Sequence, residues 1–130
     1  MNTVGPCRSA SEAQEQRVVI QWWGWLCGRL GAPESALLHI PNEGTQSTVR
    51  GRQQKMLGVR KGCPDLFLCV ARGGHHGLWI EMKRRKGGRV SPEQAAFMEQ
   101  LREQGYACEV CKGADEAQAA ITAYMRLGRE

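Results

Sequence analysis

The segment PDLFLCVARGGHHGLWIEMK, residues 64–83, contains the pattern that decides the fold. Two apolar runs, residues 65–71 and 78–83, flank a glycine-rich stretch, so they predict two strands joined as a β-hairpin. Because side chains alternate along a strand, Glu81 and Lys83 share one face of the second strand. In an antiparallel hairpin, Asp65 lies near the Glu81 end of that strand. We therefore expect two carboxylates and one ammonium group to converge at one end of the hairpin.

Helices and further strands are predicted on both sides of this hairpin. In chain order the predicted elements are a helix from Ser9 or Ser11 to Leu30, a strand over 36–40, a weak basic helix over 48–57, the hairpin strands over 65–71 and 78–83, a helix from the Ser91 cap to Gly105, a strand over 106–111 and a helix over 114–127. A hairpin followed by a strand–helix–strand crossover predicts a mixed sheet. We expect one α/β (α+β) domain over residues 11–130, with a central mixed sheet flanked by helices, after a disordered stretch at residues 1–10.

The net charge of +5 is concentrated in the middle of the chain. Residues 48–89 contain 11 Lys and Arg residues and only two acids, Asp65 and Glu81. This distribution suggests a surface for a polyanion, first of all a nucleic acid, and a solvated basic face without a partner explains the charge equally well. No apolar run is long enough to span a membrane, and the first residues do not form a secretory signal. We expect a cytoplasmic protein without membrane contact or a small-molecule cofactor.

The six cysteines include one C-x-x-C pair, Cys108 and Cys111. A second pair or a histidine motif that would complete a zinc site is missing from the sequence, and the pair falls on a predicted strand. Structural thiols are therefore the favoured interpretation. A zinc-stabilised adaptor protein is the alternative, and it predicts stoichiometric zinc.

The carboxylates of Asp65 and Glu81 offer the hard oxygen ligands that suit Mg²⁺ or Mn²⁺. A lysine beside such an ion can position water or neutralise charge on a phosphate group. An isolated E-x-K is common by chance. A P-D before an apolar strand, a glycine-rich turn and a second strand ending in E-x-K is much more specific.

Several stretches resemble the PD-(D/E)xK nuclease superfamily and, within it, the VRR-NUC (virus-type replication-repair nuclease) domain. They are IPNEG (40–44), GVRKGCPDL (58–66), GLWIEMK (77–83), KG (86–87), SPEQ (91–94) and residues 101–106. The resemblance implies a restriction-endonuclease-like αβββαβ core and Mg²⁺- or Mn²⁺-dependent phosphodiester cleavage. It also implies a homodimeric nuclease from a phage or its bacterial host that acts on branched DNA such as Holliday junctions.

By this resemblance, Asp65 and Glu81 are the metal-binding acids and Lys83 is the catalytic lysine. The backbone carbonyl of Met82 is a further metal ligand. The rival function is a non-catalytic DNA-binding protein on a degenerate nuclease fold. The intact acids and lysine argue against it, because binding alone needs no carboxylates facing phosphate.

Members of the family also carry a glutamate on the first helix, and either Glu12 or Glu15 can fill this position. We prefer Glu15, because its spacing from Val19, Trp22 and Leu26 places it on the face toward the sheet. Gln94 matches another family position, although its role in the capping box with Ser91 also explains it.

Basic residues in the charged region are expected to contact DNA phosphates: Arg50, Arg52, Lys55, Lys61, Arg84, Arg85, Lys86 and Arg89. The apolar residues of the first helix, which include Trp22 and Trp25, recur at helical spacing. We expect its tryptophans in the core or at a homodimer interface rather than stacked on bases.

Overall fold

A computed structural model describes residues 11–41 and 49–129 of the chain. The predicted disordered stretch, residues 1–10, and most of the IPNEG segment lie outside the described residues. The elements are α1 (Glu12–Leu30), a 3₁₀ turn (Glu34–Ala36), β1 (Leu37–His39), α2 (Val49–Met56), β2 (Leu66–Leu68), β3 (Leu78–Lys83), α3 (Pro92–Glu103), β4 (Ala107–Lys112) and α4 (Ala114–Met125). Their order follows the order predicted from the sequence.

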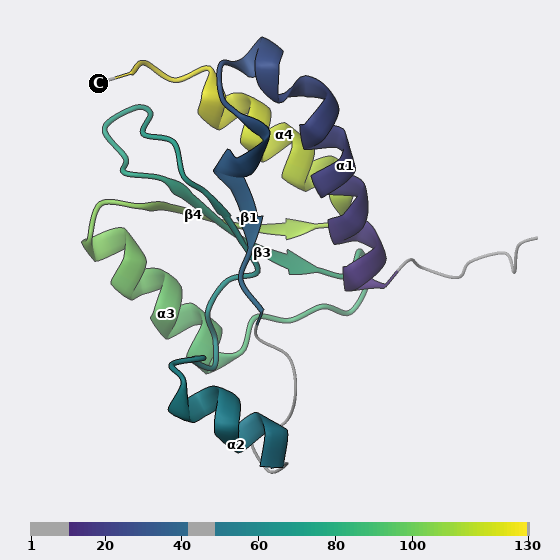
Figure 1. Cartoon of the computed structure of the whole chain (residues 1–130), viewed down its shortest axis with the longest axis vertical. Coiled ribbons are helices and arrows are strands. Elements are labelled where there is room, and N and C mark those ends of the chain that lie inside the picture. The colour runs from purple at the N-terminus through teal and green to yellow at the C-terminus, as the bar shows by residue number, and fades with distance from the viewer. Residues whose placement is uncertain (1–10, 42–48, 130) are drawn as a thin grey trace, which may run out of the picture.

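The four strands form one mixed sheet in the order β1-β2-β3-β4 (Figure 1). β1 and β2 are antiparallel, β2 and β3 are antiparallel, and β3 and β4 are parallel. Helices α1 and α4 cover one face of the sheet, and α3 lies against the other. The predicted mixed α/β fold is confirmed. β2 is shorter than predicted, because its pairing with β3 ends at Leu68. The loop that leads to β3 contains one isolated antiparallel bridge, between Arg72 and His75.

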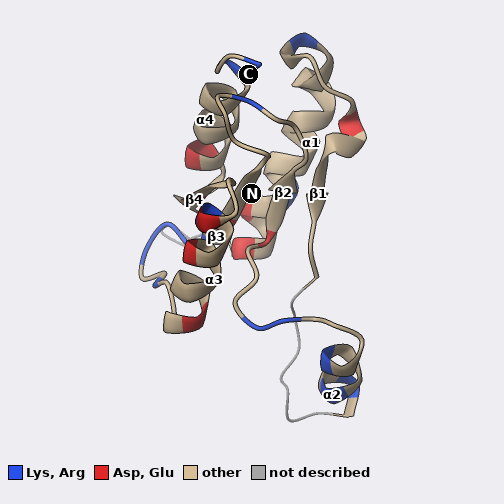
Figure 2. Cartoon of the chain, turned by 90° about the vertical axis from the view of Figure 1, so that its left-hand side faces the viewer, with Lys and Arg blue, Asp and Glu red and all other residues tan. Residues whose placement is uncertain are grey.

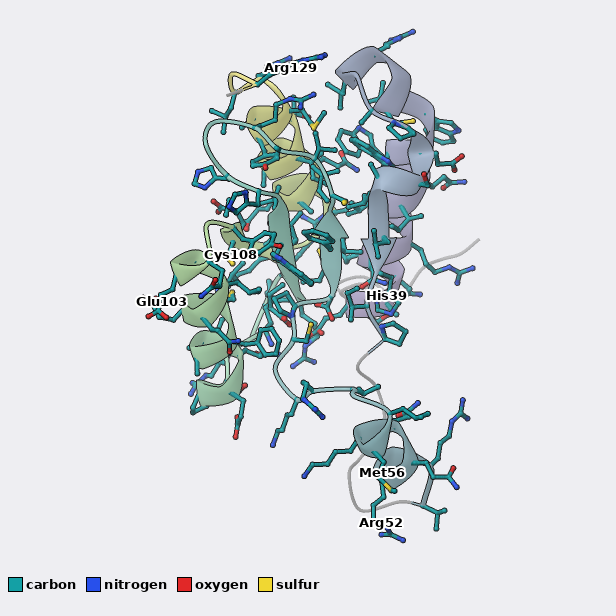
Figure 3. All side chains as sticks on the ribbon, turned by 60° about the vertical axis from the view of Figure 1, so that its left-hand side comes forward. His39, Arg52, Met56, Glu103, Cys108 and Arg129 are labelled. Atoms are coloured by element: carbon teal, nitrogen blue, oxygen red, sulfur yellow. The ribbon has the colours of Figure 1, made fainter. Side chains whose placement is uncertain are left out.

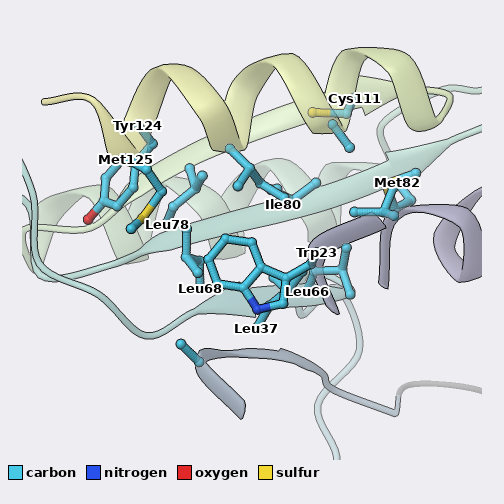
Figure 4. Close-up of a cluster of buried hydrophobic side chains, with 14 of the residues drawn as sticks. Trp23, Leu37, Leu66, Leu68, Leu78, Ile80, Met82, Cys111, Tyr124 and Met125 are labelled. Atoms are coloured by element: carbon cyan, nitrogen blue, oxygen red, sulfur yellow. The ribbon is translucent and has the colours of Figure 1, made fainter. Parts of the chain in front are cut away.

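The hydrophobic core lies between the sheet and the helix pair α1 and α4 (Figure 4). The sheet contributes alternate residues of its two central strands, such as Leu66, Leu68 and Ile80, which are fully buried. The alternation leaves Glu81 and Lys83 on the opposite face, toward α3, as the sequence indicated. The same core therefore fixes the two strands that carry the acids.

Helix α1 begins at a capping box on Ser11 and ends at Gly31, whose φ of 89° is left-handed. Its buried residues recur every four positions, from Glu15 through Val19 and Trp23 to Cys27. Of the two expected places for the tryptophans, the core and a homodimer interface, the core does not include Trp25, which is 74% exposed, because the contact with the sheet runs along this four-residue row. Trp23 fills the core, and its indole Nε1 donates to the Glu34 carbonyl at 3.0 Å.

Cys108 and Cys111 point to opposite faces of the sheet. The thiol of Cys108 lies against the Met98 carbonyl of α3, whereas Cys111 belongs to the core under α4. Residues an odd number of positions apart on a strand cannot share one metal ion. The C-x-x-C pair is therefore structural. No described helix has the length and apolar character needed to cross a membrane.

Candidate active site

Strand pairing brings Asp65 to the level of Glu81. Leu66 pairs with Ile80 in the antiparallel β2–β3 ladder, so the preceding Asp65 lies beside the next residue of β3. The Asp65 carboxylate is held there because its Oδ2 accepts a hydrogen bond from the Met82 backbone N–H at 2.7 Å. The ammonium group of Lys83 lies 3.6 Å from Glu81 Oε2. The convergence of two acids and one lysine is thus what the structure shows.

Gln94, in the first turn of α3, joins the acid and the lysine. Its Oε1 accepts from Lys83 Nζ at 2.8 Å and from the Ser91 backbone N–H at 2.9 Å. Since both partners can only donate, the amide must present its Nε2 to Glu81 Oε2, 3.1 Å away. Gln94 therefore has both roles at once: the capping box with Ser91 fixes its side-chain amide, and the same amide contacts Lys83 and Glu81.

Burial of these charges raises the pKa of both carboxyl groups. The Glu81 residue is 3% exposed, and its burial, reinforced by the Asp65 charge and opposed by Lys83, raises its pKa to about 8. Burial also raises the pKa of Asp65, against the lowering effect of its bond from Met82 N–H. Glu81 Oε1 is buried and has no hydrogen-bond partner among the described residues. A buried carboxylate oxygen normally contacts a hydrogen-bond donor or a cation, so this oxygen is available to one.

A pocket of about 330 Å³ opens over this cluster. It is lined by Asp65, Glu81 and Gln94 and, from other parts of the chain, by Glu12, Ala13, Gln16, His39 and Cys63. Figure 3 shows His39 at the end of the sheet that is nearest to α2. The pocket is lined by three acids and by no Lys or Arg, and Lys83 lies beside it through its contacts with Glu81 and Gln94.

The sequence profile of the VRR-NUC domain matches residues 7–115. This chain belongs to the VRR-NUC family. It is also similar to a solved structure of a VRR-NUC domain protein, with 32% identity, 93% of each chain covered and a TM-score of 0.80. No curated protein matches the chain. The fold is therefore that of a nuclease-type domain acting on DNA.

The cluster fits the divalent ion that VRR-NUC nucleases generally require, although only two acids form its centre. In the described part of the chain, no three His, Cys, Asp or Glu residues are grouped closely enough to hold a metal ion by themselves. Mg²⁺ usually takes one or two carboxylates and completes its shell with water and phosphate oxygens. A buried Oε1 without a described partner and a raised pKa of the Glu81 carboxyl group are both expected of a carboxylate that binds a cation.

The structure places the two candidate helix acids, Glu15 and Glu12, in different surroundings. Glu15 is buried as expected, but its two oxygens accept hydrogen bonds from Arg85, at 2.7 and 3.2 Å, and from the Ala114 N–H at 3.0 Å. The Arg85 hydrogen bond, the largest effect, lowers the Glu15 pKa. Glu12, one turn earlier, lines the pocket instead. Spacing showed which side of α1 faces inward, but not which inward acid reaches the pocket and which reaches α4.

Arg85, whose side chain is 45% exposed, also has a structural contact, and its contact with DNA stays a prediction. Its guanidinium binds Glu15 and lies 3.6 Å from Asp115, so it ties α1 to α4. Its neighbours Arg84, Lys86 and Arg89 are exposed. Lys61 is exposed and 3.7 Å from Glu93, and the three basic residues of α2 lie on a separate helix at the edge of the molecule (Figure 2).

We expect Glu15→Ala and Glu12→Ala to have opposite signatures. Glu15→Ala removes the partner of a helix N–H and of Arg85, so it should lower the free energy of unfolding by about 2–4 kcal/mol. Glu12→Ala should leave stability within about 0.5 kcal/mol and lower activity. Urea unfolding and cleavage rates measure both. A stable but inactive Glu15→Ala variant would return the helix acid to Glu15.

Sequence reasoning gave no role to three further residues that line the pocket: Gln16, His39 and Cys63. The His39 Nδ1 lies 2.9 Å from the Asp65 carbonyl, so a proton on Nδ1 is donated to it. The Cys63 thiol, one residue before Pro64, has its pKa raised to about 11 by burial and by both nearby carboxylates. The available signal was position: Cys63 lies two residues before Asp65, and His39 ends the strand that pairs with β2.

The raised pKa of Glu81 predicts that the metal-free protein loses stability as the pH rises. Between the ordinary value of 4.5 and about 8, the folded chain binds a proton at Glu81 that the unfolded chain has released. The free energy of unfolding therefore falls through this window. Thermal melting in EDTA from about pH 5 to pH 9 measures it against Glu81→Gln, which lacks this titration. Parallel pH profiles for the two proteins would contradict the prediction.

Proposed function

We propose that this VRR-NUC protein is a Mg²⁺- or Mn²⁺-dependent DNA endonuclease that prefers branched DNA such as Holliday junctions. One observation carries the proposal: a buried acid and a half-buried acid, both with raised pKa values, line an open pocket, and a buried lysine contacts the first of them. The folded protein stores unfavourable charge at this point, which is typical of a catalytic site. Structural stabilisation does not explain it, because apolar residues would stabilise the same sheet end better.

The proposed roles follow from position. The carboxylates of Asp65 and Glu81, which line the pocket, and the backbone carbonyl of Met82 would hold the ion. Met82 would contribute only its backbone, because its side chain is buried in the core. When bound, the ion supplies charge that polarises the scissile phosphodiester and lowers the pKa of water. Glu12 would contribute from the other side of the pocket.

Lys83 and Gln94 would act on the reacting groups. The Lys83 Nζ is held by Gln94 and Glu81, so its remaining N–H can face a phosphate oxygen or the attacking water. Water oxygen forms the new P–O bond, and the P–O bond to the departing strand breaks. Lys83 offsets the charge that develops on the phosphate oxygens without moving.

Cleavage assays with purified protein test this proposal. We would incubate it with supercoiled plasmid, linear duplex and a four-way junction, each with Mg²⁺, Mn²⁺ or EDTA. The expected result is cleavage with a divalent ion, fastest on the junction, and none in EDTA. Specific binding without cleavage under every metal would establish the non-catalytic alternative. Equal rates on the junction and on linear duplex would remove the preference for branched DNA.

We also propose that the protein is a homodimer that pairs through α1. Trp25 and Val18 lie two turns apart on one exposed face of this helix, beside a groove that Trp22 and Leu26 form with α4. Such an exposed apolar stripe is typical of a surface between subunits.

Trp25→Ser is therefore expected to convert a dimer into a monomer, because it removes the largest apolar side chain of this stripe. Light scattering over a range of protein concentrations measures the change. Arg17→Ser, exposed on the same helix but away from this stripe, is the matched control. A wild-type protein that is monomeric throughout, or a dimeric Trp25→Ser variant, would contradict the assignment.

A further inference from the structure

Helix α2 stands apart from the sheet and its covering helices (Figures 1 and 2). Among the described elements, none packs extensively against it. A helix of eight residues is marginal in water on its own, so most of its stability must come from what it packs against. A surface of this kind calls for a partner.

The outward side of α2 is apolar with cations at both flanks. Val49 and Met56 are two turns apart on one face and are 63% and 86% exposed, and Leu57 follows at 86%. Arg50 and Arg52 lie on either side of this face. The one buried residue of the helix, Gly51, lies on the opposite side. This pattern reverses that of an ordinary surface helix, which turns its apolar face inward.

A second, apolar pocket begins where α2 ends. It has a volume of about 330 Å³, and its walls include Leu57, Val59, Arg60, Ile40, Pro41 and Phe97. Cys63 lines this pocket and also the acidic pocket of the candidate active site, so the two are neighbours. The apolar pocket therefore lies between the outward face of α2 and the proposed position of the scissile phosphate.

We propose that this apolar surface binds an unpaired nucleobase next to the phosphate that is cut. The inference rests on the proposed nuclease function and deepens it. A single strand presents apolar base faces between charged phosphates, which matches an apolar stripe between arginines. Phe97 supplies a ring for stacking, and α2 contains three basic residues and no acid. A fully paired duplex keeps its bases inside the stack, so this surface distinguishes DNA that has an unpaired base near the cleavage position from ordinary duplex.

The test measures binding in EDTA, where no cleavage occurs, by fluorescence anisotropy. The probes are a duplex with one unpaired thymidine and the same duplex with an abasic site at that position. Wild-type protein is expected to bind the thymidine probe about tenfold more tightly, as loss of one stacked base implies. The double variant Met56→Ser, Leu57→Ser should reduce this ratio to about one or two.

Arg50→Ala is the matched control from the same helix. It should weaken binding of both probes equally and keep their ratio, because a phosphate contact does not sense the base. Equal affinity of wild-type protein for both probes, or an unchanged ratio in the double variant, would overturn the proposal. A dimer that dissociates on Met56→Ser, Leu57→Ser would also overturn it and assign the face to a second copy. The affinity ratio is independent of catalysis, so it can stand or fall separately from the cleavage assays.

Discussion

Replacing Lys83 by methionine is expected to slow DNA cleavage about a thousandfold and to leave DNA affinity within about threefold. Lys83 is 7% exposed and contacts Gln94 and Glu81, which line the pocket, so it is a fixed positive charge beside the pocket rather than part of the outer basic surface. Methionine fills a similar volume without charge, so the sheet should remain packed. Loss of this cation also removes a charge that lowers the pKa of Glu81, which weakens metal binding.

Single-turnover cleavage rates, measured with Mn²⁺ at saturating DNA, separate this effect from binding. Lys112→Met is the matched control, because Lys112 pairs with Lys83 in the β3–β4 register but is exposed and outside the pocket. The control should cleave at nearly the wild-type rate. If Lys83→Met cleaved as fast as Lys112→Met, Lys83 would have no part in the chemistry.

Changing Glu81 to glutamine is expected to abolish cleavage and, at the same time, to stabilise the metal-free protein. Glu81 is buried beside Asp65, and its Oε1 has no described partner. At pH 7 and above, wild-type protein must either take up a proton at Glu81 or bury its charge, and the neutral amide avoids both costs, so the midpoint of thermal unfolding should rise by several degrees in EDTA. The same change removes a carboxylate ligand, which should weaken Mn²⁺ binding at least tenfold.

Glu109→Gln serves as the control for this change. Glu109 pairs with Ile80 on the neighbouring strand and is exposed, so neither stability nor metal binding should respond. Thermal melts with and without Mn²⁺ and calorimetric titration of the ion measure both effects. A Glu81→Gln variant that is less stable than wild type in EDTA, or that binds Mn²⁺ equally well, would show that the buried charge is not held for an ion.

Local signals in the sequence predicted the scaffold well. Of the two predicted caps of the first helix, Ser9 and Ser11, the structure shows Ser11, and it also reproduces the Ser91 capping box and the helix end at Gly31. The hairpin pattern predicted that Asp65 and Glu81 would lie together, and the register of β2 and β3 places them so. These features depend on spacing along the chain or on one short-range pairing, which a sequence displays directly.

Features that depend on how distant elements pack were not predictable in the same way. Glu15 and Glu12 have similar spacing, but α4 supplies the Ala114 N–H that holds Glu15, and only Glu12 lines the pocket. Arg85 follows the catalytic strand among other basic residues, yet it binds Glu15 from 70 positions away. The outward apolar face of α2 is likewise visible only once the rest of the core has formed without it.

The most direct test of metal-dependent catalysis at this cluster is to follow Mn²⁺ occupancy and cleavage rate together in the same samples. Electron paramagnetic resonance reports the bound ion, and single-turnover assays report the rate. We predict that both rise together as Mn²⁺ is added, vanish together in EDTA, and fall together in Glu81→Gln. Cleavage that persists in EDTA, or Mn²⁺ bound equally by wild type and Glu81→Gln, would contradict the assignment of Asp65, Glu81 and Lys83 as the active site.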